Sequence, residues 1–360
     1  QGVSVFSSNY TLYADFSARL NGIYGIYTEE IEVYSIDESF LFFPEWSSNQ
    51  LEEIAHNIRN TTAQWTGIPV SVGIAPTKTL AKLCNKLAKN TDGVFNWNTC
   101  NKELVLKNCK VANIWGIGYS KAKVLNRYGV NTALDLSHMS LYLAKKLLTI
   151  QGMKTVQELQ EIKAIDITIR QGHKNITASK SFAHLVTDRD EIQTAVAEYT
   201  QEAVRRMRKD KKGAQSIVVL LMNSPWACKE SPVFQSSVYT FSDITAYLPE
   251  ILHAANMLLA QMFQAGVGYR KVMISLLGLE NYNGPEQDLF DDNKHSKKQE
   301  QLMSIVDKIT DKYGQNMIFP GTKKLKPEVN KEGEISNRIM QRNYLSPSYT
   351  TNISQLPQVL

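Results

Sequence analysis

Cysteines, long apolar runs and a strong charge imbalance are all scarce or absent in this chain. Its four cysteines never form a Cys-x-x-Cys pair. They therefore indicate neither a zinc site nor a disulfide framework. No stretch approaches the roughly 20 apolar residues that a membrane-spanning helix needs, and the N-terminus lacks the order of a signal peptide. We therefore expect a cytoplasmic protein that does not enter a membrane.

The net charge of +5 is only a mild basic excess. Such a balance favours a polyanionic partner without identifying one, so the position of the charges matters more than their sum. The basic residues gather in three clusters, at 205–212, 294–298 and 323–326. By default, each cluster is a solvated helix end or loop.

The first hundred residues have the pattern of an α+β unit. Apolar spacing predicts helices over 9–24, 51–65 and 77–87 and strands over 31–33, 40–43 and 70–74. This order is typical of helices packed on one face of an antiparallel sheet. The alternation of Val3, Val5 and Phe6 also predicts a strand in the middle of a domain. Because the chain begins with Gln1 at that point, we expect an upstream segment to be missing.

The rest of the chain divides into three further parts. Short helices punctuated by glycine run from 111 to about 161, and the polar residues 166–176 predict a linker. Strands at 179–186, 216–222, 237–241 and 271–277 and helices at 190–208 and 248–264 then follow in the order β-α-β-β-α-β, a split ferredoxin-like unit. Beyond residue 281 the sequence is polar apart from one expected helix near 300–313.

Asp37 and Glu38 are the first candidates for chemistry. Neighbouring carboxylates on a regular strand point to opposite faces, so they reach one site only where the backbone turns, as between the two strands expected here. Nucleotidyl transfer by a Mg²⁺ pair needs such hard oxygen ligands. Taken alone, an acidic pair at a turn is more often simply exposed to solvent and without a role in chemistry.

A strand that ends in Gly73 and Pro76 leads into a lysine-rich helix capped by Thr77. A helix N-terminus with nearby lysines suits phosphate. The lysines at 78, 82, 86 and 89 share one face, which in isolation is more often simply exposed to solvent.

The third pattern is Gly116-Ile117-Gly118, followed by Lys121 and Lys123. Glycines between two short helices let the backbone approach a phosphate closely, as in a helix-hairpin-helix. Such contacts hold nucleic acid without reading its sequence.

Together these patterns resemble the Y-family DNA polymerases, and specifically the UmuC subfamily. Residues 34–38 look like the family's palm motif, 73–82 like its Gly-Ile-Ala-x-Thr-Lys-Thr-Leu-Ala-Lys segment and 115–118 like its thumb hairpin. Further matches lie at 6–15, 179–182, 265–271 and 345–351. The last is similar to the C-terminal segment of UmuC rather than to the DinB branch.

The resemblance implies an α+β multidomain fold and an error-prone translesion polymerase of the SOS response. The expected parts are an incomplete ferredoxin-like palm with a remnant of the fingers (1–98), an all-α helix-hairpin-helix thumb (99–165), a linker (166–176), a β-α-β-β-α-β little finger (177–280) and a UmuC-type tail (281–360). Asp37 and Glu38 would bind two Mg²⁺ ions, and Lys89 would meet the incoming deoxynucleoside triphosphate. Gly116, Ile117, Gly118 and Lys121 would hold primed, damaged DNA.

The family's first metal-binding Asp would lie upstream of Gln1. We therefore expect the chain as given to bind primed DNA without extending it, because one of three metal carboxylates would be missing.

The tail segment 286–290 resembles the family's sliding-clamp motif, in which Gln287, Leu289 and Phe290 would contact the clamp. The family usually opens this motif with Gln, whereas Glu286 stands here. A UmuD-like protein and a RecA filament are further partners implied by the resemblance. The alternatives are a non-catalytic DNA- and clamp-binding protein and, less favoured, a helix-hairpin-helix glycosylase or nuclease.

Overall fold

The computed structural model describes most of the 360-residue chain. The described residues are 3, 5–44, 47–166, 173–223, 234–282, 294–313, 318, 320, 321, 344–347, 350 and 352–355. The chain forms two compact units, one made of residues 1–170 and 343–360 and the other of residues 171–342. Among the described residues, no helix combines the length and the apolar character needed to cross a membrane.

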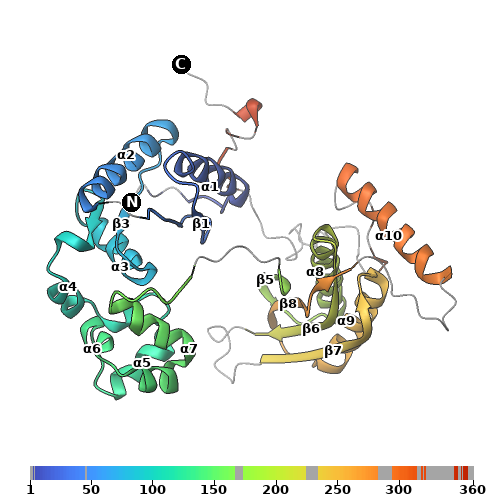
Figure 1. The fold of residues 1–360 in the computed structure, drawn as a ribbon. Helices are drawn as coiled ribbons and strands as arrows, with labels where there is room; N and C mark the ends of the chain where they lie inside the picture. Colours follow the sequence, from blue (N-terminus) through green and yellow to red (C-terminus); the bar gives the residue numbers. More distant parts are fainter. Residues whose placement is uncertain are drawn as a thin grey trace. The chain divides into compact units, whose positions relative to one another are not determined.

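Two small sheets and three helices form the start of the first unit (Figure 1). Their bounds are α1 (Tyr10–Tyr24), β1 (Ile31–Val33), β2 (Ser39–Leu41), α2 (Ser48–Thr66), β3 (Val72–Ile74), α3 (Lys78–Ala88) and β4 (Val94–Asn96). β1 and β2 pair antiparallel, whereas β3 and β4 pair in parallel. The expectation of an antiparallel sheet is therefore wrong for β3. Parallel neighbours need a crossover connection, and α3 supplies it.

The strand expected at Val3, Val5 and Phe6 is also wrong. These side chains are exposed, and no named strand includes them. Among the described residues of this segment, the pairing found is an isolated bridge between Ser7 and Leu345. An alternating pattern makes a strand only where a neighbouring strand supplies the hydrogen-bond partners.

Further helices follow in the first unit. They are η1 (Trp97–Thr99), α4 (Lys102–Asn108), η2 (Val111–Asn113), α5 (Tyr119–Arg127), α6 (Ala133–Ser137) and α7 (Leu141–Leu159). Their core is continuous with α3, because Leu80 and Cys84 share one buried cluster with Leu125, Leu136 and Leu148. The helical module and the mixed α/β part are therefore packed as one body.

The second unit confirms the β-α-β-β-α-β order. It contains β5 (Ile176–Val186), α8 (Arg189–Lys209), β6 (Lys212–Met222), β7 (Phe234–Thr245), α9 (Leu248–Met262) and β8 (Tyr269–Leu277), followed by β9 (Glu280–Asn281). The antiparallel sheet has the order β5-β8-β6-β7, and β9 pairs with β6. Every second side chain of β6, at Ile217, Val219 and Leu221, is buried in the core that α8 and α9 cover. The other face of the sheet stays without a covering helix among the described residues (Figure 1).

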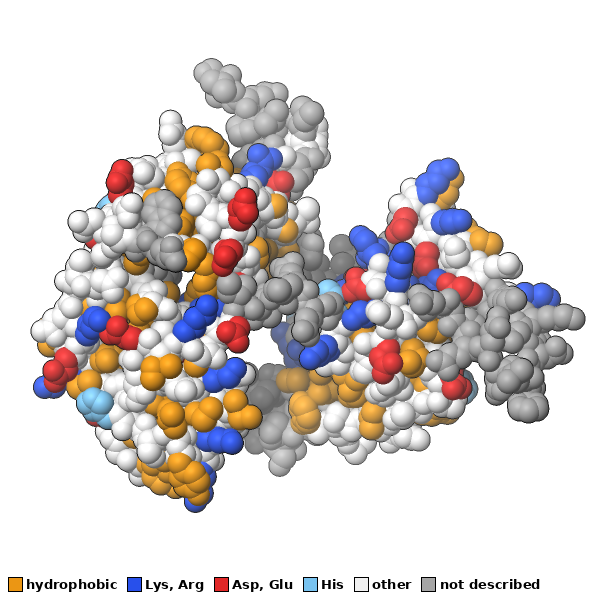
Figure 2. Space-filling view, viewed as in Figure 1, with side chains coloured by type: hydrophobic (Ala, Val, Ile, Leu, Met, Phe, Trp, Pro, Cys, Tyr) orange, Lys and Arg blue, Asp and Glu red, His pale blue; other side chains and the backbone are white. Residues whose placement is uncertain are grey.

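Arg208 of α8 binds α10 (Lys294–Tyr313) within the second unit. The Arg208 guanidinium lies 2.9 Å from Glu300 and 2.8 Å from Asp307, and only 8% of its side chain is exposed. Burial lowers the pKa of Arg208, but these two carboxylates outweigh that effect, so the pKa is raised above its usual value. Figure 2 shows acidic and basic side chains side by side over this region. The basic cluster at 205–212 is therefore partly neutralised within the protein.

The C-terminal segment folds back onto the start of α1 in the first unit. The amide of Ser7 donates to the Tyr344 carbonyl at 2.7 Å, and Asn9 Nδ2 donates to the Ser346 carbonyl at 3.0 Å. Asn9 is also the N-cap of α1, because its Oδ1 accepts from the Leu12 amide at 3.2 Å. A single buried side chain therefore starts the helix and holds the tail.

We predict that Asn9→Asp loosens the tail and leaves α1 intact. Aspartate keeps the acceptor that caps the helix but loses the donor to Ser346. A hydrogen bond of this kind contributes about 1 kcal/mol, so amide exchange over 344–350 should become roughly fivefold faster. Hydrogen exchange measured by mass spectrometry tests this result. Asn101→Asp is the matched control, because Asn101 caps α4 through Leu104 and holds no tail; equal exchange in both variants would contradict the prediction.

Candidate active site

Asp37 and Glu38 lie in the tight turn between β1 and β2. The amides of Tyr34 and Ser35 both donate to the Glu38 carbonyl, at 3.1 and 3.0 Å, which reverses the chain. The Ser35 hydroxyl donates to Asp37 Oδ1 at 2.6 Å. The turn frees the two neighbouring carboxylates from the opposite-face geometry of a regular strand. The expected acidic turn is confirmed, and the metal-binding role of its carboxylates stays a prediction.

One cavity of about 710 Å³ brings the acidic turn and the lysine helix together. Asp37, Glu38, Lys82 and Lys89 all line it, and its remaining wall comes largely from apolar side chains of α1, α2, β2 and β3. The Lys82 ammonium forms an ion pair with Glu38. Lys89 is exposed at the C-terminal end of α3. The cavity wall therefore carries carboxylates, which can bind a metal ion, and ammonium groups, which can bind an anion.

Lys78 does not face solvent, so the interpretation of a purely solvent-facing lysine stripe is wrong at this position. Its ammonium lies 2.5 Å from Glu32 of β1, and the two side chains are only 4% and 8% exposed. It also donates to the Asp166 carbonyl at 2.6 Å and lies 5.3 Å from the Phe40 ring centre. Removing one partner of a buried pair leaves an uncompensated charge, so the pair fixes β1 against α3. In the sequence, Glu32 stands out as a charged residue between two apolar strand residues, and this pattern could have indicated a buried ion pair.

Glu158 of α7 anchors the N-terminus of α3. It is fully buried, and its Oε2 accepts from the Thr79 amide at 2.8 Å and from the Thr79 hydroxyl at 2.7 Å. Its Oε1 accepts from the Ile165 amide at 3.0 Å, and its carbonyl accepts from the Thr77 hydroxyl at 2.9 Å. A carboxylate of the protein itself therefore binds the N-terminus of the helix, where an external anion would otherwise bind. No local motif in the sequence marks this residue, so it was not predicted.

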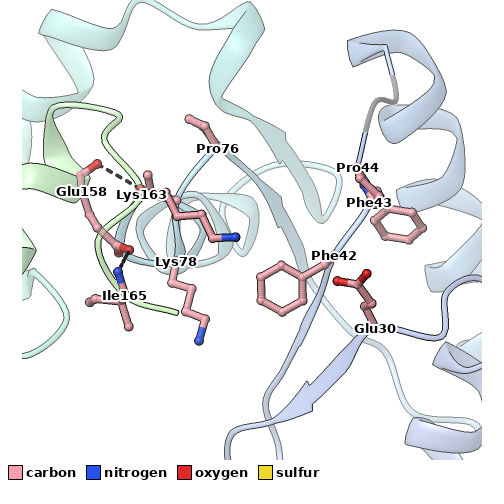
Figure 3. Close-up of a pocket in the computed structure, with 10 residues that line it drawn as sticks. Glu30, Phe42, Phe43, Pro44, Pro76, Lys78, Glu158, Lys163 and Ile165 are labelled. Carbon is pink, nitrogen blue, oxygen red and sulfur yellow. Dashed lines mark hydrogen bonds between the residues drawn. The ribbon is translucent and has the colours of Figure 1, made fainter. Parts of the chain in front are cut away.

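A smaller cavity of about 220 Å³ lies beside this anchor. Figure 3 shows Glu158 and Ile165 on one wall and Glu30, Phe42 and Phe43 on the other. The expected phosphate site at the α3 N-terminus is thus wrong, since Thr77 and Thr79 are both bonded to Glu158. The lysines that face the larger cavity come from the middle and the end of the helix.

The glycine hairpin has the expected open backbone. Gly116 has a φ of 82°, which favours glycine, and both Gly116 and Gly118 are exposed. Ile117 differs: its side chain is 4% exposed, and its amide donates to the Ile114 carbonyl at 3.0 Å. Lys121 donates to the Gly116 carbonyl at 3.0 Å. Ile117 and Lys121 therefore support the hairpin, and the two glycines present its surface.

The clamp-motif residues Gln287, Leu289 and Phe290 lie outside the described residues.

Three family models match the sequence. The impB/mucB/samB family matches residues 1–86, and the C-terminal domain of the same family matches residues 173–289. A domain of unknown function matches residues 300–359, the region of α10 and the returning tail.

Known proteins match across nearly the whole chain. Protein UmuC of Salmonella typhimurium is 32% identical over 99% of this chain and 84% of the relative. DNA polymerase IV of Oceanobacillus iheyensis is 25% identical over 94% of this chain and 79% of the relative. Among solved structures, a Y-family DNA polymerase chimera of Dbh and Dpo4 has a TM-score of 0.60 and 21% identity, over 75% of this chain and 77% of that chain. This likeness confirms the α+β polymerase fold.

We predict that Glu158→Gln destabilises α3. Each carboxylate oxygen accepts from a backbone amide, so the glutamine NH2 group must face the amide of either Thr79 or Ile165, and both amides are donors. A buried donor left unpaired costs about 1–3 kcal/mol. The measurement is the free energy of opening α3, from hydrogen exchange across a urea series. Glu53→Gln, an exposed change on α2, is the control, and a similar effect of both changes would count against the anchor.

Proposed function

Because this chain belongs to the UmuC branch of the impB/mucB/samB family, we propose that it is the catalytic part of a translesion DNA polymerase. The reaction is template-directed addition of a deoxynucleotide to a primer, opposite damaged bases, with low fidelity. The single observation that carries the proposal is the cavity that contains Asp37, Glu38 and Lys89 together. A relative that is named DNA polymerase IV supports the reaction class.

Asp37 and Glu38 are the residues that would hold divalent metal. Their carboxylate oxygens are the ligands that Mg²⁺ prefers. Among the described residues, no group of three His, Cys, Asp or Glu side chains forms a metal cluster, so this pair is a partial donor set. When bound, a Mg²⁺ pair supplies charge stabilisation to the attacking and leaving oxygens. The protein's own contribution is the turn, which places both residues on the wall of one cavity.

The remaining roles follow from charge and exposure. Lys89 would bind the triphosphate through its ammonium, since the residue is exposed and lines the same cavity as Asp37 and Glu38. Gly116 and Gly118 would hold the DNA backbone through their exposed main chain. The open face of the β5-β8-β6-β7 sheet would lie along the duplex. None of these contacts reads base sequence, as a polymerase for varied templates requires.

We expect Asp37→Asn with Glu38→Gln to abolish nucleotide insertion by the product of the complete gene. Neutral amides bind Mg²⁺ weakly, and the loss of several kcal/mol of charge stabilisation lowers the rate at least about a hundredfold. Affinity for primed DNA should change less than about threefold, since its main contacts lie elsewhere. The measurement is single-nucleotide insertion opposite an abasic site, with anisotropy for DNA binding.

Glu29→Gln is the control for that experiment, because Glu29 is exposed just before β1 and does not line the cavity. Undiminished insertion by the double variant would refute the proposal. If the complete product binds primed DNA and never extends it, the alternative of a non-catalytic DNA- and clamp-binding protein holds instead.

The sliding clamp is the partner proposed for residues 286–290. In this motif the Leu289 and Phe290 side chains would fill an apolar pocket of the clamp as anchors. Changing both to alanine should remove capture of the chain by immobilised clamp. Leu302 and Ile305, an exposed apolar pair on α10, changed to alanine, form the control. Unchanged capture of the first variant would refute the assignment.

Family membership is the support for the other proposed partners, a UmuD-like accessory protein and a RecA filament. The same membership supports a role in the SOS response and in the cytoplasm, where replication takes place.

A further inference from the structure

Three aromatic side chains connect the acidic turn to the glycine hairpin. Tyr34 stands three residues before Asp37, Phe40 lies on β2, and Trp115 directly precedes Gly116. The ring centres of Tyr34 and Trp115 are 5.5 Å apart at 86°, and those of Phe40 and Trp115 are 5.8 Å apart. Tyr34 and Phe40 also meet edge to face, at 5.8 Å. We call these three residues the aromatic clasp.

A directional hydrogen bond adds to the ring contacts of the clasp. Trp115 Nε1 donates to the Tyr34 hydroxyl at 3.0 Å. Edge-to-face packing alone tolerates sliding, whereas a hydrogen bond fixes both distance and direction. The contact joins residues 81 positions apart in the sequence, both within the first unit.

Each side of the clasp is attached to a fixed piece of backbone. The Tyr34 amide donates to the Glu38 carbonyl, so Tyr34 forms the base of the acidic turn. Trp115 lies between Ile114 and the glycine hairpin, and Ile114 and Ile117 are buried in the helical core. A shift at one end of the clasp must therefore move the other end.

The same tyrosine also connects to the carboxylates. The Lys82 ammonium lies 5.4 Å from the centre of the Tyr34 ring and forms the ion pair with Glu38. Trp115, Tyr34, Lys82 and Glu38 thus form a continuous series of contacts. It runs from the proposed DNA-holding backbone to a proposed metal ligand.

We propose that Trp115 and Tyr34 are positioning residues that set the separation between the glycine hairpin and the Asp37–Glu38 turn. The inference rests on the proposed polymerase function. A primer strand held at Gly116 and Gly118 must present its end to the carboxylates, and both contacts are on one stiff duplex. A fixed separation between protein sites therefore converts DNA binding into productive alignment.

Conservative variants test the hydrogen bond while an aromatic ring stays at each position. Trp115→Phe removes the indole N–H, and Tyr34→Phe removes the hydroxyl. In the complete gene product, each should lower the maximal insertion rate about five- to tenfold and change the Kd for primed DNA less than about twofold. The double variant should be no slower than the slower single variant, because both changes remove one interaction.

The control variants remove the same groups elsewhere in the unit. Trp65→Phe on α2 and Tyr128→Phe after α5 change exposed side chains outside the clasp, and both should insert at the original rate. Multiplicative losses in the Tyr34–Trp115 double variant, or equal losses in the controls, would overturn the proposal. A parallel rise in Kd would also overturn it, because it would show a binding role only.

A second measurement keeps the inference testable if the chain proves not to be a polymerase. Hydrogen exchange at residues 35–39 should become about fivefold faster in Trp115→Phe than in Trp65→Phe, although residue 115 lies far away in sequence. Unchanged exchange there would overturn the coupling. Coupled exchange without any insertion by the unmodified protein would refute only the proposed function.

Discussion

The first unit depends on a buried carboxylate at the start of α3. Glu158 comes from α7 and accepts hydrogen bonds from the amides of Thr79 and Ile165. Thr79 lies 79 positions before it in the sequence, and Ile165 lies seven positions after it. A helix N-terminus carries unpaired amides and a partial positive charge, so a carboxylate is its natural partner. Because the carboxylate is fully buried, each lost bond leaves an unpaired polar group. This one contact therefore fixes the helix that bears the site lysines to the module that bears the glycine hairpin.

A second buried ionic contact fixes the same helix to the acidic turn. Lys78 is the first residue of α3, and its ion pair with Glu32 crosses to β1, directly before the turn. Buried ion pairs add little net stability, but they penalise every arrangement in which the partners separate. Glu158 thus binds Thr77 and Thr79, and Glu32 binds Lys78 between them. The relative position of α3, β1 and α7 follows from these two carboxylates.

Local patterns allowed much of the site to be predicted from the sequence. The Asp37–Glu38 turn, the Thr77 cap and the β-α-β-β-α-β order each depend on residues within a few positions, and all three were found. The errors concern long-range partners. The three-residue β4 is too short to show a period, and no strand in the described part of the chain pairs with Val5 or Phe6. Glu158 acts on Thr79, 79 residues away. Pairings of this kind depend on the folded chain and leave no local signal.

The two ends of α3 differ in a way that suits a nucleotide site. Its N-terminal end is immobilised by buried carboxylates, whereas Lys86 and Lys89 at the other end are exposed. An exposed ammonium on a flexible side chain can follow a triphosphate, but its field is screened beyond roughly 8 Å at physiological salt. It is therefore effective only if the backbone beneath it is already held at the right place. The buried charges give that rigidity, and the exposed charges keep the freedom to bind.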